Sequence, residues 1–484
     1  MRKLALLLLC LLAIGAAPAR ADTPQIEPTF DVPDGYRVEK SHELAPGLLQ
    51  ATLTRANPAE VVTLAVRTAD SPTQLRVVLS NNAIAGPSPT LERTSSMCAR
   101  IDCIVAVNGD FFADATGQPV GAVITDGQLL RSPNVKHHQL SEDATGVLSA
   151  GPMTWRGAIV PSDLQQLALT GVNVARNAND LILYTPAEGP ATGTNPYGVE
   201  MTLQVVRPAG TIRLSKTALV RITGLVHGGN TPIPTDGAVL SGHGTMQRAL
   251  EDLWARVQTG TADAQALLRL DTDPPVTQSV GGSPILVRDG HRWFPEEQRD
   301  LYRLRAPRTM AGWASDGSML LVTVDGRQAG RSVGMTMDEA ADLMIGLGAT
   351  DAINLDGGGS TAFVRDGVVV NHPSDRAVRR DGETVVVKTP RPGDKVIGSI
   401  ERPVAVALAI VGPRLESPLL GGRQVNAGLV VPLGAPGSPA GSTAALRLAH
   451  PEGPNTSATL MVLLALTAGV VNARRRRPAV SPAR

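Results

Sequence analysis

Aromatic residues are scarce in this sequence, and neither sign of charge is in excess. Phe, Trp and Tyr make up 3% of the 484 residues, which argues against a long groove that stacks sugar rings on aromatic side chains. The 45 Lys and Arg residues nearly cancel the 44 Asp and Glu residues. This balance removes the electrostatic argument for nucleic acid as a partner and leaves small or neutral ligands open.

Cysteine is also rare, with three in the whole chain. Cys10 lies inside the first apolar run, which is expected to be removed after export. The remaining pair, Cys98 and Cys103, favours a disulfide across a short loop in an oxidising compartment. A metal site would need further cysteine or histidine ligands near them.

The N-terminal segment has the pattern of a secretory signal peptide. Arg2 and Lys3 precede an apolar run from Leu4 to Ile14, and Ala19-Arg20-Ala21 forms a small-residue cleavage site. We therefore expect residues 1–21 to be a signal peptide, residues 22–43 to be an N-terminal extension, and the mature chain to be exported.

The C-terminal segment predicts a membrane anchor. Residues 431–458 are rich in Pro, Gly, Ser and Ala, which is typical of a linker. The apolar residues 459–473 lead into four consecutive arginines, which favour a spanning helix and a basic cytoplasmic tail over 474–484. The expected location is the cell envelope, with the main domain outside the cytoplasm. A helix packed on the domain, or a removable sorting tail without an LPxTG motif, are the alternatives.

Between these ends, short β-rich runs alternate with a few helices, which predicts a strand-rich mixed α/β (α+β) fold. Thr336 and Glu339 form a capping box that begins a helix, and Gly346 and Gly348 end it. The predicted strands include Leu75–Leu79, Ile104–Val107, Met201–Val206, Met319–Val324 and Ala352–Leu355.

The stretch INLDGGGSTAFV, Ile353 to Val364, places one carboxylate, Asp356, after a strand and before three glycines and two hydroxyls. Three glycines allow close backbone approach, so that successive amides can point at one anion. A carboxyl group beside such a nest suits proton donation to a leaving phosphate or stabilisation of a sugar cation. Taken alone, the motif is more often a tight turn with a solvated aspartate.

Further segments change that balance when taken together: TSSMCARIDCIVAVNGDFF, YTPAEGPATGTNPYGVE, IPTDGAVLSGHG, and the run from Arg308 through DGGGSTAFV to ERPVAVAL. With them the chain resembles bacterial members of the phosphodiester glycosidase family over roughly Leu44 to Pro413, taken as one domain, 44–413. The resemblance implies that family's mixed fold and hydrolysis of a sugar 1-phosphodiester at the anomeric C–O bond. The segment from Asp375 to Ile400 departs from the pattern and is expected to be an insertion.

The resemblance implies a set of site residues. Asp356 is expected to act as the acid/base, and Asn108 is expected to bind a sugar hydroxyl. Arg308 is expected to bind the charged phosphodiester, because a planar guanidinium binds two phosphate oxygens. Asp110 and His243 are further catalytic candidates, although relatives often carry glycine or alanine at the position of Asp110. The remaining substrate-binding candidates are Gly357, Gly358, Gly359, Ser360, Thr361, Asp325, Ser332, Gly334 and Asn371.

Other readings stay open at this point. Glu339 is a second carboxylate, but its capping role explains it. His137 and His138 lack a nearby acid at zinc-ligand spacing, and a calcium ion on Asp-Gly turns is open although no EF-hand pattern occurs. The expected partner is a phosphorylated glycan. A metal-dependent phosphodiesterase that breaks P–O, and a binder of phosphorylated glycans without catalysis, are the alternative functions.

Overall fold

The computed structural model describes residues 30–415, except 86–90, 135, 295–302, 381–382, 388–390 and 393. The predicted signal peptide, linker, anchor and basic tail lie outside these residues. Within the described part of the chain, no helix has both the length and the apolar character needed to cross a membrane.

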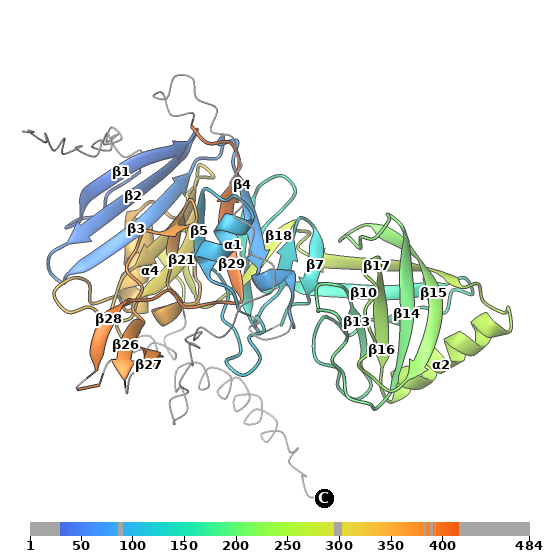
Figure 1. Ribbon diagram of the computed structural model, residues 1–484. Coiled ribbons are helices and arrows are strands. Elements are labelled where there is room, and N and C mark those ends of the chain that lie inside the picture. The colour runs from blue at the N-terminus through green and yellow to red at the C-terminus, as the bar shows by residue number, and fades with distance from the viewer. Residues whose placement is uncertain are drawn as a thin grey trace, which may run out of the picture.

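An eight-stranded antiparallel sheet forms the centre of the larger lobe (Figure 1). Its strand order is β1 (Arg37–Ala45), β2 (Leu48–Arg55), β3 (Glu60–Arg67), β22 (Met319–Val324), β21 (Arg308–Trp313), β23 (Asp351–Asn354), β19 (Ile285–Arg288) and β20 (His291–Arg292). The last part of the expected N-terminal extension, residues 37–43, therefore belongs to β1.

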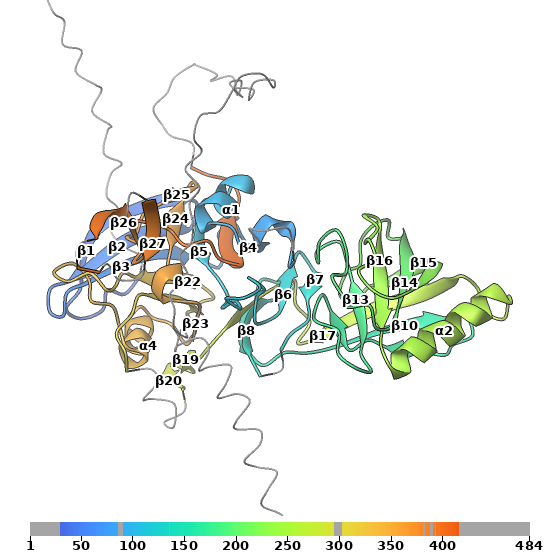
Figure 2. The same ribbon diagram turned by 60° about the horizontal axis from the view of Figure 1, so that its bottom comes forward.

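Strand β22 shows why this sheet is a middle layer. All six of its residues are buried, and alternate side chains point to opposite faces of a strand. Met319 and Leu321 join one hydrophobic cluster, whereas Leu320 and Val322 join another, which includes helix α4 (Met337–Gly346). The sheet is thus covered on both faces, and Figure 2 shows α4 beside β19 and β20.

Two five-stranded sheets cover the face opposite α4. One has the order β25 (Val368–Val369), β24 (Phe363–Arg365), β5 (Val105–Asn108), β29 (Val406–Val411) and β4 (Gln74–Leu79). The other has the order β7 (Gln128–Arg131), β6 (Val123–Thr125), β18 (Gln278–Gly282), β8 (His138–Glu142) and β9 (Leu148–Gly151). Helix α1 (Thr94–Arg100) packs on β5, and the predicted disulfide joins its Cys98 to Cys103.

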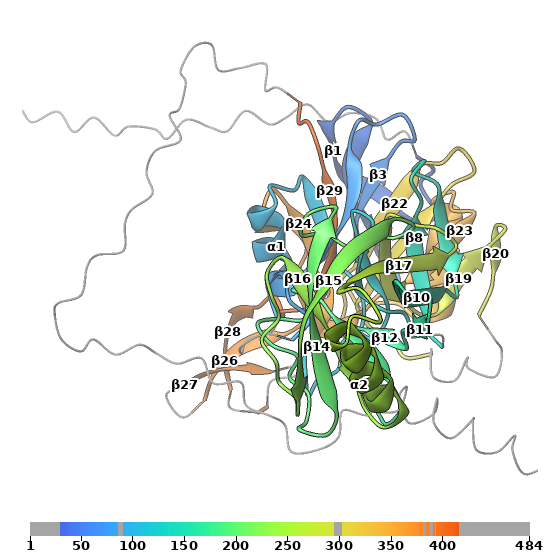
Figure 3. The ribbon, with the colours of Figure 1, turned by 90° about the vertical axis from the view of Figure 1, so that its right-hand side faces the viewer.

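Residues 154–273 form a second lobe around another eight-stranded sheet, seen end-on in Figure 3. The order is β11 (Leu167–Ala168), β10 (Thr154–Pro161), β17 (Gln265–Asp273), β15 (Thr217–His227), β14 (Val199–Arg207), β16 (Gly237–Gly242), β13 (Leu181–Tyr184) and β12 (Gly171–Val172). Helix α2 (Thr245–Gln258) covers it. Thr154 is the cross-strand partner of Asp273, so the chain enters and leaves this lobe at neighbouring points.

The second lobe shares its hydrophobic cluster with the larger lobe. Ile124 and Leu129, from β6 and β7, pack in the same cluster as Leu203, Leu240 and Leu268 of the second lobe. The two lobes are therefore joined by packed apolar side chains as well as by two chain crossings.

The expected insertion forms a separate three-stranded sheet of β27 (Glu383–Val387), β26 (Arg376–Arg380) and β28 (Lys395–Ser399). Its base is fixed by an ion pair, in which the guanidinium of Arg402 donates to both carboxylate oxygens of Asp375 at 2.8 and 3.1 Å. This pair lies next to the DGGGS motif, as the site geometry below shows.

The expected strands and the capped helix are confirmed, and strands dominate the fold as predicted. Thr336 accepts a hydrogen bond from the amide of Glu339, and Glu339 accepts one from the amide of Thr336. The expected mixing of strand directions is slight, because β12 with β13 is the one parallel pair among the described strand pairs.

Candidate functional site

Asp356 lies directly beyond β23, where the central sheet meets the end of β5. The amide of Leu355 donates to the carbonyl of Thr309 at 2.8 Å, and the amide of Asp356 donates to the carbonyl of Gly109 at 2.9 Å. These two bonds hold the strand end between β21 and the residue that follows β5. The VNGDFF and DGGGS segments, far apart in sequence, are therefore adjacent in space.

The side chain of Asn108 joins the VNGDFF and DGGGS segments by hydrogen bonds. Its Nδ2 donates to the carbonyl of Asp356 at 2.6 Å, and its Oδ1 accepts from the Thr309 hydroxyl at 2.7 Å and the Ala362 amide at 3.1 Å. The side chain has no exposed surface. Asn108 thus positions the turn that carries Asp356, rather than reaching outward to a sugar hydroxyl.

A second buried network supports the far side of the turn. The carboxylate of Asp325 accepts from Asn371 Nδ2 at 3.1 Å and from the His372 amide at 3.0 Å. Asn371 Oδ1 accepts from the amide of Phe363, and the Ser332 hydroxyl donates to the Asp325 carbonyl at 2.6 Å. Burial raises the pKa of Asp325, and these hydrogen bonds oppose that rise. The structure therefore brings Asp325, Ser332 and Asn371 together as support for the turn.

The turn does not form the expected nest of three glycine amides. Gly357 donates to the Asp356 carboxylate at 2.9 Å, and Gly358 donates to the carbonyl of Pro307 at 2.9 Å. Ser360 and Thr361 donate back into the turn, to the carbonyls of Gly357 and Gly358. Among the five amides from 357 to 361, only that of Gly359 has no partner within the described residues, so the turn itself consumes the other donors.

The glycines instead allow two arginines to lie against the turn. A Cβ on Gly359 would stand 2.1 Å from Nη2 of Arg402, and one on Gly358 would stand 3.1 Å from Nη2 of Arg327. Gly358 also has a φ of 64°, a conformation that side chains disfavour. Arg327 makes no hydrogen bond or ion pair to any described residue, so its guanidinium is available to a ligand.

Arg308 is placed differently from the expectation. Its Nε donates to the carbonyl of Met335 at 2.9 Å and its Nη2 to the carbonyl of Leu304 at 2.8 Å. Burial and the nearby charge of Arg327 lower the pKa of Arg308 to about 10. Arg308 therefore ties backbone segments together close to the site, while Arg327 and Arg402 carry the guanidinium groups that face the turn.

The electrostatics of Asp356 are unusual for an aspartate. Burial raises its pKa to about 6, and the negative charge of Asp110 acts in the same direction. The nearby Ser360 hydroxyl, the Arg402 charge and the Gly357 amide act against the rise. An acid with such a pKa holds its proton through mildly acidic conditions and can exchange it near neutral pH.

Asp110 and His137 form a pair on the other side of Asp356. His137 Nε2 lies 2.9 Å from Asp110 Oδ1, and the amide of Gly121 donates to Asp110 Oδ2 at 2.6 Å. A Cβ on Gly281 would stand 2.4 Å from both oxygens of Asp110, so the VGGSP segment must carry glycine there. His137 Nδ1 has no hydrogen-bond partner among the described residues, which leaves it free to accept a proton.

Three other candidates lie apart from this cluster or already have partners. His243 begins the turn into α2, with its amide bonded to Asp180 and its ring near that of Tyr197 at 6.5 Å, all within the second lobe. Glu339 caps α4 and pairs with Arg305. Gly334 has a φ of 85° and packs against the backbone of residue 306, which makes it a turn residue.

The described residues hold no group of three or more His, Cys, Asp or Glu side chains arranged to bind a metal ion. The acids and the histidine of the site are instead bonded to backbone amides, to one another or to arginines.

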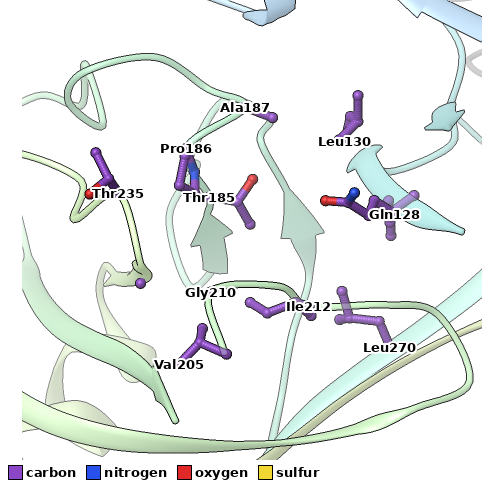
Figure 4. Close-up of a pocket in the computed structure, with 12 residues that line it drawn as sticks. Gln128, Leu130, Thr185, Pro186, Ala187, Val205, Gly210, Ile212, Thr235 and Leu270 are labelled. Atoms are coloured by element: carbon purple, nitrogen blue, oxygen red, sulfur yellow. The ribbon is translucent and has the colours of Figure 1, made fainter. Parts of the chain in front are cut away.

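A cavity of about 150 Å³ lies at the junction of the two lobes (Figure 4). Its lining comes from β7, from the turn after β13 and from the second lobe, and includes Gln128, Leu130, Thr185, Ala187 and Ile212. None of the lining residues is acidic, basic or a histidine. The cavity therefore has no group for acid/base chemistry, and Asp356 with its neighbours is the better candidate for the reacting centre.

Residues that depend on three-dimensional proximity are not evident from the sequence. His137 has no zinc-ligand spacing in the sequence, and the sequence assigns no role to Arg327 or Arg402. One signal was available for Arg327, because an arginine directly after an Asp-Gly turn lies where a loop leaves a strand. No sequence feature joins His137 to Asp110.

Comparison with known proteins shows which family the chain resembles. Residues 216–411 match the family model of the phosphodiester glycosidase domain, a range that includes Arg308, Arg327, Asp356 and Arg402. The N-acetylglucosamine-1-phosphodiester alpha-N-acetylglucosaminidase of Bos taurus is 32% identical over 142 residues, which is 25% of this chain and 27% of that protein. The Homo sapiens enzyme of the same name is 30% identical over 142 residues, with the same shares. The chain thus matches about a quarter of the length of these relatives.

Solved structures agree on the fold. A hypothetical protein from Synechocystis gives a TM-score of 0.54 at 18% identity, covering 81% of this chain and 64% of that one. A putative exported protein from Burkholderia pseudomallei gives 0.51 at 23% identity, covering 73% and 74%. Taken together, the sequence matches show that residues 216–411 are similar to the phosphodiester glycosidase domain, and the solved structures show a similar fold.

Proposed function

We propose that the protein hydrolyses a sugar 1-phosphodiester in exported or envelope glycans and breaks the bond between the anomeric carbon and oxygen. The observation that carries the proposal is the Asp356 carboxyl group, with a pKa of about 6, beside a glycine turn on which two guanidinium groups lie. An acid next to cations suits a substrate that is an anion when bound and gains negative charge as it leaves.

Arg327, Arg402 and the Gly359 amide are the proposed holders of the phosphodiester. Arg327 makes no hydrogen bond or ion pair within the described part of the chain, and a guanidinium binds phosphate oxygens in a forked geometry. Arg402 already pairs with Asp375, which fixes its orientation and leaves part of its charge for the ligand. Asp356 stays compatible with the anion while it is protonated, so the site does not repel its own substrate.

Asp356 is the proposed proton donor to the leaving group. When the C–O bond breaks, its electron pair passes to the phosphate oxygen, and the diester becomes a phosphate monoester. The second ionisation of such a monoester has a pKa of about 6. This equals the pKa of Asp356, so the proton transfer is close to balanced, which is the condition for efficient general acid catalysis.

The Asp110–His137 pair is the proposed base for water. His137 Nδ1 accepts a proton from water as the water oxygen bonds to the anomeric carbon, and Asp110 holds the opposite ring nitrogen and stabilises the resulting charge. One C–O bond forms and one breaks, and the proton lost by Asp356 is balanced by the one that His137 gains.

The test is hydrolysis of a panel of sugar 1-phosphodiesters by the mature protein in water enriched in heavy oxygen. Label in the free sugar is the expected result. Label in the phosphate would mean P–O cleavage and would overturn the proposal in favour of a phosphodiesterase. Saturable binding of every diester without any turnover would instead indicate a glycan-binding protein.

Export and membrane anchoring are the second part of the proposal. The Cys98–Cys103 disulfide supports an oxidising compartment, because such bonds are rare in the cytosol. The N-terminal signal and the apolar segment over 459–473 are the sequence features behind it. Full-length protein should fractionate with membranes, whereas a chain ending near Val431 should be released in soluble form, and equal solubility of both would remove the anchor.

A further inference from the structure

Glu188 is a buried acid whose carboxylate contacts no cation among the residues that the structure describes. It follows β13 in the turn that meets the larger lobe, where its carbonyl accepts from the Ala85 amide and its own amide donates to Thr185, both at 2.8 Å. Only 6% of the residue is exposed. Its carboxylate makes no hydrogen bond to any described residue, and Oε2 is fully enclosed.

Arg131, a half-buried residue at the end of β7, is the matching cation. Its Nη1 donates to the carbonyl of Asn173 at 3.0 Å, but Nε is enclosed without a partner. Burial lowers the pKa of Arg131, while the charges of Glu188 and Asp110 act in the opposite direction. Arg131 therefore lies within the electrostatic reach of both carboxylates, which connects Glu188 with the Asp110 side of the candidate site.

The two opposite charges do not touch. Within the described residues, no ion pair joins Arg131 to Glu188 at 4.0 Å or less, although burial makes each unpaired charge costly. Buried polar atoms without a protein partner are uncommon and generally meet water or a ligand. A water molecule or a ligand between the two groups, rather than direct contact between them, is the arrangement that satisfies the hydrogen-bonding atoms of both.

The packing near these two residues also leaves space. The cavity at the lobe junction is lined by Gln128 to Leu130 and by Thr185 to Ala187, the segments that lead directly into Arg131 and Glu188 (Figure 4). Its volume of about 150 Å³ exceeds the share of several waters, each of which occupies about 30 Å³ of liquid. The lining includes neither Arg131 nor Glu188, so the cavity adjoins the two groups through their chain neighbours.

The chemistry selects the class of ligand. A second anion would be repelled by Glu188 and Asp110, and a cation by Arg131. Neutral hydroxyl groups satisfy all of them, because a carboxylate accepts from two hydroxyls and a guanidinium donates to a hydroxyl oxygen. We propose that Glu188 and Arg131 form the subsite that binds the hydroxyl groups of the glycosyl unit, beside the Asp110–His137 pair. This inference rests on the proposed function.

The experiment compares wild-type protein with Glu188→Gln and Arg131→Met. Steady-state kinetics on a sugar 1-phosphodiester should show KM raised at least 10-fold in both variants, with kcat changed less. Inhibition by the free monosaccharide should weaken by a similar factor, whereas inhibition by inorganic phosphate should stay as in wild type. Arg221→Met, at an exposed position, and Glu251→Gln, at a half-buried one, both in the second lobe, are the matched controls and should change neither value.

Deoxygenated substrates separate recognition from a structural role. Removing the hydroxyl that Glu188 binds should raise KM in the wild type but raise it less in Glu188→Gln, because the charge-assisted bond to that hydroxyl is already replaced by a weaker neutral one. Additive losses at every sugar position, or unchanged monosaccharide inhibition in both folded variants, would overturn the subsite. If Glu188→Gln fails to fold, Glu188→Asp keeps the charge and withdraws it by one methylene, and it should show the same weakening.

The outcomes also separate this inference from the proposed function. Unaltered KM in both variants with normal turnover would remove the subsite and leave the hydrolase. If the wild type binds a monosaccharide, as measured by calorimetry, and cleaves no diester, the function fails. Loss of that binding in Glu188→Gln would then still support the subsite.

Discussion

At the scale of single residues, the site is a set of charges whose neighbours determine their roles. Asp356 is an acid made weak by burial, Arg327 is a cation without a hydrogen-bond or ion-pair partner among the described residues, and Arg308 is a cation already bonded to backbone carbonyls. The residue types alone do not distinguish these situations. Their contacts do, and each contact leads to a separate expectation.

Asp356→Asn should lower kcat at least 10²-fold and leave substrate binding largely intact, because the amide keeps the size of the side chain but cannot donate a carboxyl proton. In the wild type, kcat/KM should fall as the pH rises through about 6, where Asp356 loses its proton. The pH dependence of the initial rate measures this limb. A variant that turns over at nearly the wild-type rate would leave Asp356 as a turn residue.

The same substitution should change stability in a pH-dependent way. The pKa of Asp356 is about 6 in the folded protein and 3.8 in the unfolded chain, so the folded state binds more protons between these values and loses stability as the pH rises. Asp356→Asn removes this loss. Relative to wild type it should gain up to about 3 kcal/mol between pH 4 and pH 8, at 1.36 kcal/mol per pKa unit. Urea unfolding at both pH values gives the difference, and a constant offset would contradict the raised pKa.

Arg327→Gln should raise KM for the diester by roughly 10-fold or more, because it removes a charge that is free to bind phosphate, and charge-assisted bonds contribute about 1.5–3 kcal/mol.

Arg308→Lys should act mainly on stability, since a lysine cannot donate to both Met335 and Leu304 in a fixed fork. Kinetics and thermal unfolding of both variants provide the comparison. If Arg308→Lys raises KM more than Arg327→Gln does, Arg308 is the residue that binds the phosphate, as the sequence alone suggested.

At the scale of elements, the glycine turn and the inserted sheet are coupled through one ion pair. The turn is a short 3₁₀ segment, Gly358–Ser360, and Arg402 with Asp375 closes the base of the insertion directly against Gly359. The absence of side chains in the turn is what makes room for this pair. A change in the turn should therefore be felt in the insertion.

Gly359→Ala tests this coupling. The added Cβ would meet Arg402 Nη2 at 2.1 Å and Asp375 Oδ1 at 2.3 Å, so the ion pair must shift. We expect KM to rise and proteolysis of the 376–399 segment to become faster. Gly398→Ala is the control, since a Cβ there meets nothing within 4 Å. Equal behaviour of the two variants would show that the turn and the insertion are independent.

Local features of the chain allowed the elements to be predicted, but not their meeting points. The capping box of Thr336 and Glu339 and the apolar run of β22 contain their own evidence within a few residues. The pairing of Asp110 with His137, across 27 residues, does not, because it arises from a loop and a strand end packed by the β18 glycines. The hydrogen bonds of the glycine amides could not be predicted either, because their acceptors lie in the turn itself and in Pro307.

At the scale of the whole molecule, the candidate site lies in the larger lobe, and the second lobe reaches toward it through the turn that carries Glu188. The sequence expectation of one domain over 44–413 contains both lobes. Their separate sheets could not be foreseen from strand patterns, because every strand looks alike until its hydrogen-bond partner is known.

The shared apolar cluster of the two lobes has a thermodynamic consequence. Because Ile124 and Leu129 of the larger lobe are buried by side chains of the second, neither lobe can melt without exposing part of the other's interior. The chain enters and leaves the second lobe at the paired residues Thr154 and Asp273, a geometry that would otherwise suit an independent unit. Calorimetry should show one cooperative transition, with equal calorimetric and van't Hoff enthalpies. Leu129→Ala should lower its midpoint without splitting it, whereas two resolved peaks would mean that the cluster does not link the lobes.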